Sequence, residues 1–169
     1  MQWILVHIFI FWYNENMIYS QNEEELISIG QKLGRLLDSG DIIVLSGDLG
    51  AGKTTLTKGI AKGLDISQMI KSPTYTIVRE YEGRLPLYHL DVYRIGDDPD
   101  SIDLDDFLYG EGVTIIEWGE LLDESLLGDY LLISISHHGD GRQLLIESFG
   151  PRSKEIQEEM VNGWARISH

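Results

Sequence analysis

Residues 42–55 read IIVLSGDLGAGKTT and combine three structural signals within one short segment. The run Ile42–Leu45 is apolar throughout and β-branched at three positions, which is typical of a strand buried on both faces. It leads directly into a glycine-rich loop. The following residues, Lys53–Leu64, keep a large aliphatic side chain on every fourth position and predict a helix. A buried strand, a glycine-rich turn and a helix in this order indicate an α/β domain.

Further helices and strands are predicted on both sides of this segment. Predicted helices cover Asn22–Asp38 and Ser153–Trp164, and predicted strands cover Thr76–Val78, Leu85–Leu90, Val113–Ile116, Tyr130–Ser136 and Arg142–Phe149. The turn His137–Gly141 joins the last two strands into a hairpin. We expect a single α/β domain, flanked by helices, whose sheet is parallel around the loop and antiparallel at the hairpin edge. The terminal helix is polar and is expected to be peripheral.

Composition narrows the class of protein. Thirteen Lys and Arg face 28 Asp and Glu, which gives a net charge of −15. Such a surface repels phosphate backbones and argues against direct binding of RNA or DNA. The chain has no cysteine, which excludes disulfides and thiolate metal sites and agrees with a reducing cytoplasm.

The first thirteen residues, MQWILVHIFIFWY, are almost wholly apolar. They are too short to span a bilayer and lack the features of a signal peptide. Three interpretations remain open: a strand added to the sheet, an interfacial anchor, or a start upstream of the working protein, which we favour because Met17 opens a well-formed domain. We therefore divide the chain into an extension at 1–16, a domain at 17–150 and a C-terminal helix and tail at 151–169.

The loop Gly47–Thr54 has the form Gly-x-x-x-x-Gly-Lys-Thr of a P-loop. Its glycines let backbone N–H groups surround phosphates, and the helix that follows points its positive end at the same anion. Lys53 is placed to reach the β- and γ-phosphates, and the Thr54 hydroxyl is a ligand for Mg²⁺. The loop predicts a P-loop NTPase-like fold that binds ATP or ADP with Mg²⁺ and hydrolyses ATP.

A second carboxylate is expected near the metal, because Mg²⁺ takes few protein ligands, all of them oxygens. Glu117 follows the apolar run Val113–Ile116, and Asp91 follows Leu85–Leu90. Ligands of open α/β sheets lie beyond the carboxyl ends of the strands, so both acids can converge on the phosphates. One would hold Mg²⁺ and the other would orient the attacking water. The alternative is that either acid caps a helix or lies on a solvated rim.

Other polar residues are open to two interpretations. Ser72-Pro73-Thr74 is either a segment that senses a γ-phosphate or an ordinary loop. His89 alternates with Asp91 and can face the site, although a core histidine is the commoner case. We expect Trp118 to be a packing residue and expect no metal at His137 and His138. Arg142 opens the last strand and is within reach of a nucleotide.

Four segments together resemble one family, the bacterial TsaE ATPases. They are Gly47–Thr55, then Ser72–Thr76 (SPTYT), then His89–Arg94 (HLDVYR), then Ile116–Trp118 (IEW), in this order and spacing. The resemblance covers about residues 20–149. It implies a cytoplasmic ATPase needed to make threonylcarbamoyladenosine at position 37 of tRNA, acting with the partner pair TsaD and TsaB, so that tRNA is met only indirectly and no membrane is involved.

The resemblance also implies roles for individual residues. Nucleotide contacts fall on Asp48, Gly50, Ala51, Gly52, Lys53, Thr54, Thr55, Asp91 and Arg142; Mg²⁺ ligands on Thr54 and Glu117; and residues needed for hydrolysis on Lys53, Asp91 and Glu117. The segment near Glu23 matches the contact on the adenine side. The apolar extension departs from the family pattern.

Two other functions remain open. A small-molecule P-loop kinase usually closes an arginine-bearing lid over the transferred phosphoryl group, and the seven arginines of this chain are dispersed. A nucleotide-dependent interaction module uses the same residues as a slow ATPase. The acidic stretch Asp97–Asp106 and the region Tyr75–Glu82 are candidate docking surfaces.

Overall fold

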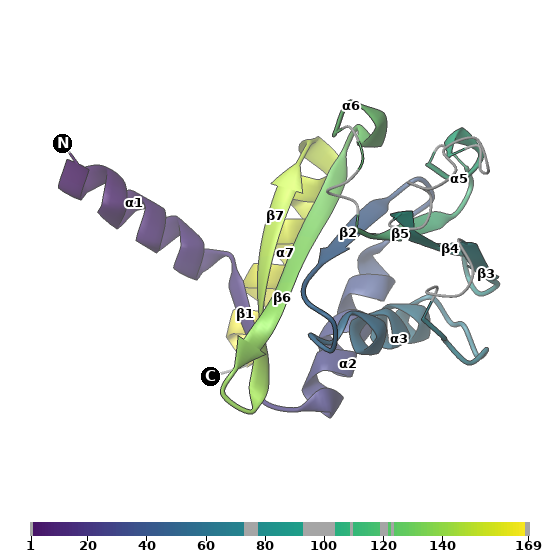
Figure 1. Cartoon of the computed structure of the whole chain (residues 1–169), viewed down its shortest axis with the longest axis horizontal. Helices are drawn as coiled ribbons and strands as arrows, with labels where there is room; N and C mark the ends of the chain where they lie inside the picture. The colour runs from purple at the N-terminus through teal and green to yellow at the C-terminus, as the bar shows by residue number, and fades with distance from the viewer. Residues whose placement is uncertain are drawn as a thin grey trace.

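The computed structural model describes residues 2–72, 78–92, 104–108, 110–118, 122 and 124–167. In chain order, the elements are α1 (Gln2–Glu15), β1 (Met17–Ser20), α2 (Glu23–Leu36), β2 (Ile42–Ser46), α3 (Lys53–Gly63), β3 (Val78–Tyr81), β4 (Leu87–Asp91), α5 (Asp105–Leu108), β5 (Val113–Glu117), α6 (Glu124–Leu127), β6 (Tyr130–His138), β7 (Gly141–Phe149) and α7 (Pro151–Ile167). Figure 1 shows helices packed around one twisted sheet, with α1 extending away from it.

The sheet has seven strands in the order β1-β7-β6-β2-β5-β4-β3. β2 lies at its centre and pairs in parallel with β5 and β6, and β5 pairs in parallel with β4. The hairpin β6–β7 is antiparallel, as predicted, although its strands extend further and pair His138 with Gly141. The predicted mixed sheet is confirmed. In addition, β3 pairs antiparallel with β4 at the opposite edge, which the sequence did not indicate.

The central strand β2 is buried on both faces, as its apolar run predicted. Ile43 and Leu45 pack in the larger core cluster, to which α2, α3 and α7 contribute. Ile42 and Val44 point to the other face and pack in a smaller cluster with residues of α5 and α6. Because side chains alternate along a strand, a continuous apolar run fits a strand covered on both sides. The loop that follows β2 therefore starts from a strand that is paired on both sides and covered on both faces.

Helices α2 and α3 are packed unusually closely, because each carries two glycines four residues apart. These are Gly30 and Gly34 of α2 and Gly59 and Gly63 of α3. A Cβ at any of the four would press against backbone atoms of the opposite helix. The close packing also brings the first turn of α2 to the glycine-rich loop, where the Leu26 side chain lies against Gly52. Helix α2 thus packs directly against the glycine-rich loop.

The terminal helix α7 belongs to the core, so the expectation of a peripheral helix is wrong. Ile156 and Met160 are buried in the larger core cluster. Ser153 and Gln157 are buried too, and Gln157 donates hydrogen bonds to the Ile146 carbonyl (2.6 Å) and the Asn16 side chain (2.9 Å). An analysis of periodicity assigns such polar residues to the solvent-facing side of a helix. Here their hydrogen bonds offset the free-energy cost of burying them. The buried face of α7 was therefore hidden in the sequence.

A cluster of paired charges fastens α7 to α2, and we refer to it as the Arg152 corner (Arg152, Asp41 and Asp129). Arg152 donates to the two Asp41 oxygens (3.0 and 3.1 Å) and to the Leu36 carbonyl (2.7 Å). Donation of hydrogen bonds to the Asp41 carboxylate raises the pKa of Arg152 above its ordinary value. The Asp129 carboxylate accepts the backbone N–H groups of Arg152 (2.7 Å) and Ser153 (2.9 Å) and so caps α7. Every charge of the corner has a partner.

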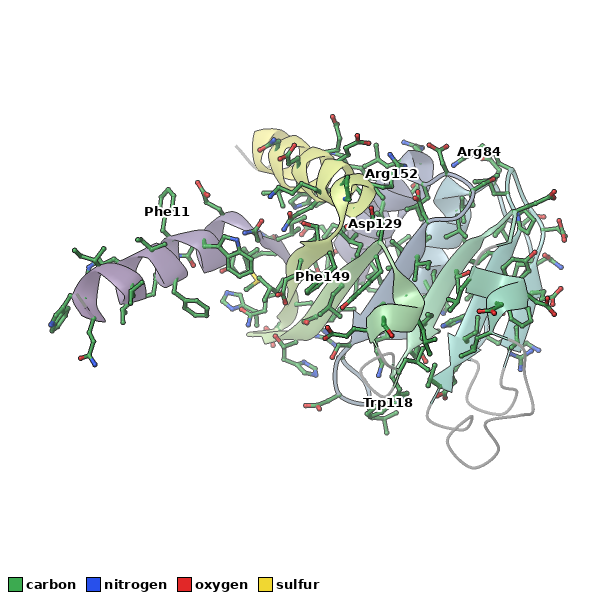
Figure 2. All side chains as sticks on the ribbon, turned by 90° about the horizontal axis from the view of Figure 1, so that it is seen from above. Phe11, Arg84, Trp118, Asp129, Phe149 and Arg152 are labelled. Carbon is green, nitrogen blue, oxygen red and sulfur yellow. The ribbon has the colours of Figure 1, made fainter. Side chains whose placement is uncertain are left out.

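Residues 2–15 form the helix α1, so the interpretation of this segment as an added strand is wrong. A continuous apolar run has no two-residue alternation, and periodicity alone does not separate strand from helix in such a run. Its large apolar side chains are between 40% and 79% exposed: Trp3, Ile4, Leu5, Val6, Ile8, Phe9, Ile10, Phe11 and Trp12. Figure 2 shows Phe11 pointing away from the body of the protein. Among the described residues, no helix is long and apolar enough to cross a membrane.

Candidate nucleotide-binding site

The loop between β2 and α3 has the backbone geometry that its glycines predicted. Gly50 has a φ of +80° and Gly52 a φ of +116°, a region that side chains other than glycine rarely adopt. Gly52 is also the residue before the first turn of α3, and its carbonyl accepts the Leu56 N–H at 2.9 Å. The free N–H groups of the first turn of α3 therefore open onto the loop, as anion binding at a helix N-terminus requires.

Lys53 lies back against the loop. Its ammonium nitrogen donates to the Gly47 carbonyl at 2.7 Å and lies 4.9 Å from the centroid of the Trp118 ring. Both contacts stabilise the positive charge, the first as a charge-assisted hydrogen bond and the second as a cation–π interaction. Phosphate oxygens would bind the ammonium group more strongly than the Gly47 carbonyl and the Trp118 ring do. A bound phosphate is therefore expected to replace both contacts of Lys53.

The two predicted acids end neighbouring strands. Asp91 is the last residue of β4 and Glu117 the last of β5, and the two are direct partners in the parallel ladder. On its other side Glu117 pairs with Leu45 of β2, two residues before the loop. Both acids are buried, with 4% of each residue exposed. The sheet order therefore brings Asp91, Glu117 and the loop together at the carboxyl ends of the parallel strands. We call this set, with His89 and Lys53, the strand-end site.

His89 and Glu117 form a close pair inside the strand-end site. His89 Nε2 lies 3.6 Å from Glu117 Oε1, and the His89 side chain has no exposed surface. Among the described residues, neither ring nitrogen of His89 has a hydrogen-bond partner, and neither does Glu117 Oε1. His89 therefore combines both interpretations offered by the sequence, because it is a core histidine that also faces the site.

Arg142 is held by the glycine-rich loop itself. Its Nε donates to the Ala51 carbonyl at 2.6 Å, and its terminal nitrogens donate to the carbonyls of Gly141 (2.8 Å) and Gly50 (3.4 Å). The sequence had assigned Arg142 a contact with ATP through the family resemblance. The structure shows its guanidinium donating to two carbonyls of the loop, and the contact with ATP stays a prediction. Here it braces the loop so that the N–H groups remain directed inward.

Trp118 differs from the sequence expectation of a packing residue. It is 36% exposed and has a φ of +63°, a left-handed conformation that is uncommon for a residue other than glycine. Strained backbone of this kind clusters at functional sites. Figure 2 shows Trp118 at the opposite side of the molecule from Arg152. The signal in the sequence was its position directly after a strand-ending acid, and in the structure its ring lies against the Lys53 ammonium group.

The remaining loop residues suit a bound Mg²⁺ and nucleotide. Thr54 and Thr55 lie half-buried in the first turn of α3, and Asp48 is exposed on the loop. A hard cation prefers oxygen ligands, which the Thr54 hydroxyl and the Glu117 carboxylate provide. The Glu117 side chain keeps 6% of its surface exposed at the end of β5, so its carboxylate can be reached from the loop side. The residues present therefore fit the predicted group.

Several predicted residues cannot be placed in the site. Pro73, Thr74 and most of Asp97–Asp106 lie outside the described residues. Ser72 is described, and its carbonyl accepts the Arg79 Nε–H at 3.2 Å. His138 is exposed at the end of β6, where its ring lies 4.8 Å from that of Tyr19. A hollow of about 1170 Å³ lies between β1, α2 and α7, and its lining includes Gln21 and Glu25 of the segment near Glu23 but no residue of the loop or of the strand ends.

Fold and loop together define the class. A central parallel strand leads into a glycine-rich loop and a helix, and acids end the two strands that follow on one side of it. This is the architecture of a P-loop protein of the α/β class.

Comparison with known proteins identifies the family. Residues 20–144 match the family model TsaE, described as threonylcarbamoyl adenosine biosynthesis protein TsaE. The chain is 43% identical over 141 residues to a protein of this name from Bacillus subtilis, covering 82% of this chain and 89% of the relative. It is 42% identical to one from Treponema pallidum, covering 73% and 93%. The crystal structure of Bacillus subtilis YdiB is similar, with a TM-score of 0.76, 37% identity and coverage of 90% and 95%. The chain belongs to the TsaE family.

Proposed function

We propose that this chain is a Mg²⁺-dependent ATPase of the tRNA threonylcarbamoyladenosine pathway. One observation carries the enzymatic part of the proposal: the loop, Asp91 and Glu117 meet at one edge of the sheet, at the ends of three neighbouring strands. The family match and the names of the relatives support the pathway. ATP hydrolysis requires a phosphate cradle, a metal ligand and a group that orients water, and the strand-end site has a candidate for each.

Each residue of the site has a role in this proposal. The N–H groups of the loop and of the first turn of α3 bind the phosphates, and Lys53 exchanges its contacts with Gly47 and Trp118 for the β- and γ-phosphates. Thr54 and Glu117 would hold Mg²⁺, which would supply positive charge beside the phosphates. Asp91 is buried beside Glu117 in the ladder, where it can accept a proton from water and orient that water.

The partners in this proposal are proteins of the TsaD and TsaB type, which carry out the chemistry on tRNA. The net charge of −15 supports this division of work, because an acidic chain has little attraction for tRNA phosphates. A contact through partner proteins needs no basic face. In this proposal, ATP hydrolysis by this chain acts on the complex with the partner proteins and is not a step in the chemistry on tRNA.

A small-molecule kinase is disfavoured by the positions of the arginines. A kinase of this kind needs guanidinium groups that close over the transferred phosphoryl group. Here Arg84 donates to the carbonyls of Gly34 and Leu37, and Arg79 to that of Ser72. Arg142 and Arg152 are likewise committed to backbone carbonyls. Within the described part of the chain, these four arginines stabilise the fold and do not form a lid.

A phosphate-release assay tests the proposal. We expect slow release from ATP by the isolated chain in the presence of Mg²⁺, and faster release when TsaD- and TsaB-type proteins are added. Asp91→Asn should retain nucleotide binding and lose release in both conditions. A chain that binds ATP without measurable release in either condition would instead be a nucleotide-dependent interaction module. Failure to bind ATP at all would contradict the proposal.

A further inference from the structure

His89 occupies the middle of β4, in a position where a polar side chain needs a reason. Its neighbours in the strand, Leu87 and Leu90, are fully buried apolar residues, and His89 itself has no exposed surface. Within the described residues, neither of its ring nitrogens has a hydrogen-bond partner. Burying an imidazole under these conditions costs free energy, and an apolar residue of similar size would fill the space without that cost. A polar group that faces the imidazole ring would explain why a histidine is buried here.

The ring faces Glu117. His89 Nε2 lies 3.6 Å from Glu117 Oε1, slightly beyond hydrogen-bond length, and Oε1 is itself buried and without a partner among the described residues. An N–H group and a carboxylate oxygen that are both desolvated complete each other's hydrogen bonding when they close this distance. Among the described residues neither atom has a hydrogen-bond partner, and closing the 3.6 Å gap would satisfy both.

The side chains are not equally accessible. The Glu117 side chain keeps 6% of its surface exposed, whereas that of His89 keeps none. A metal bound at the strand-end site can therefore reach the carboxylate, while the imidazole lies behind it. Mg²⁺ also prefers oxygen to nitrogen ligands. His89 is thus placed to act through Glu117 and not on the metal directly.

We propose that His89 is a positioning residue, whose Nε2–H holds Glu117 Oε1 and so directs the carboxylate toward Mg²⁺ beside the nucleotide. This inference rests on the proposed function, because it needs the metal that the ATPase would use. Groups of this kind behind a metal ligand fix its orientation, and their loss typically lowers metal affinity by about 10–100-fold.

The test measures metal binding directly and not through turnover. Mn²⁺, which replaces Mg²⁺ and is visible by electron paramagnetic resonance, is titrated into the chain in the presence of ADP, and ADP affinity is measured separately in EDTA. His89→Leu keeps the core filled but removes the donor, and should weaken Mn²⁺ binding about tenfold with ADP affinity in EDTA unchanged. His89→Gln restores a donor of similar reach and should recover most of the Mn²⁺ affinity.

Tyr88→Leu is the matched control, because Tyr88 is the adjacent residue and points to the opposite face of β4, where its ring meets that of Phe107 at 5.2 Å. It should leave Mn²⁺ binding unchanged. Mn²⁺ affinity in His89→Leu equal to that of the wild type, or an equal loss in Tyr88→Leu, would overturn the role of His89. If His89→Leu does not fold, a folded His89→Gln with a full tenfold loss would also overturn it. Absence of Mn²⁺–ADP binding by the wild-type chain contradicts the proposed function itself.

Discussion

The strand-end site and the Arg152 corner both bury charged groups, but they differ in how completely those groups are hydrogen-bonded. At the Arg152 corner the guanidinium contacts both oxygens of Asp41, and Asp129 accepts two backbone N–H groups. At the strand-end site His89 and Glu117 are buried with polar atoms that lack hydrogen bonds among the described residues. Removing one partner of a buried ion pair destabilises a fold, whereas buried polar groups without partners already cost stability and call for a reason such as a ligand. The contrast distinguishes a structural cluster from the proposed nucleotide-binding site.

The largest expected effect is at Lys53. Lys53→Ala should lower ATP affinity by at least about 100-fold, since charge-assisted hydrogen bonds to the phosphates contribute about 3 kcal/mol together. Calorimetric titration with Mg²⁺–ATP measures it. Lys58→Ala is the control, because Lys58 lies exposed on the same helix. An unaltered affinity in Lys53→Ala would remove the loop from the binding site.

A stability effect without a binding effect is expected at the Arg152 corner. Arg152→Met should lower the free energy of unfolding by about 2 kcal/mol, because it leaves Asp41 buried without its cation; the partial exposure of Arg152 keeps the loss below that of a fully buried pair. Urea unfolding measures this, with Lys154→Met, an exposed neighbour on α7, as the control. ATP affinity should not change. Loss of both properties together would mean that the two clusters are coupled.

The same isosteric change should have opposite effects on stability in the two clusters. Glu117→Gln should weaken the Mg²⁺ dependence of ATP binding about tenfold, or 1.4 kcal/mol, and raise the free energy of unfolding, because a buried carboxylate becomes neutral. Asp41→Asn should lower the free energy of unfolding, because Arg152 loses a charged partner. Parallel urea unfolding and ATP titrations at several Mg²⁺ concentrations compare the pair. Equal changes in stability would refute the distinction between the clusters.

The smallest effect concerns pH and Asp129. Burial opposes the charged form, but hydrogen bonds from Ser153 and Arg152 prevail and lower the pKa of Asp129 below its ordinary value. A group whose pKa is lowered by folding contributes stability above its unfolded pKa, and this contribution is lost as the pH falls through the folded value. Asp129→Asn should cost up to about 1 kcal/mol at pH 7, because the negative charge at the N-terminus of α7 is lost. Unfolding at pH 7 and pH 3 should show that the difference from wild type shrinks in acid.

Much of the strand-end site could be predicted, because its parts follow local rules. A glycine-rich loop after a buried strand has one common geometry, and acids that directly follow apolar runs lie at strand ends. The residues Lys53, Asp91 and Glu117 were named on these grounds, and the structure brings them together. The contacts of Arg142 with Gly50 and Ala51 were not predicted, because they join residues about ninety positions apart. Nothing next to Arg142 in the chain indicates which side of the loop it reaches.

The position of α7 shows the same limit. Its buried face includes Ser153 and Gln157, which look solvent-facing until their partners are known. Local pattern was sufficient for the loop, for the helix after it and for most of the strands, because periodicity and glycine placement act between residues close in sequence. Tertiary structure decided that Glu117 lies between Asp91 and Leu45, that His89 faces Glu117, and that Arg152 joins α7 to Asp41. These arrangements depend on strand order and helix packing, in which residues far apart in the chain are brought into contact by burial of a shared core.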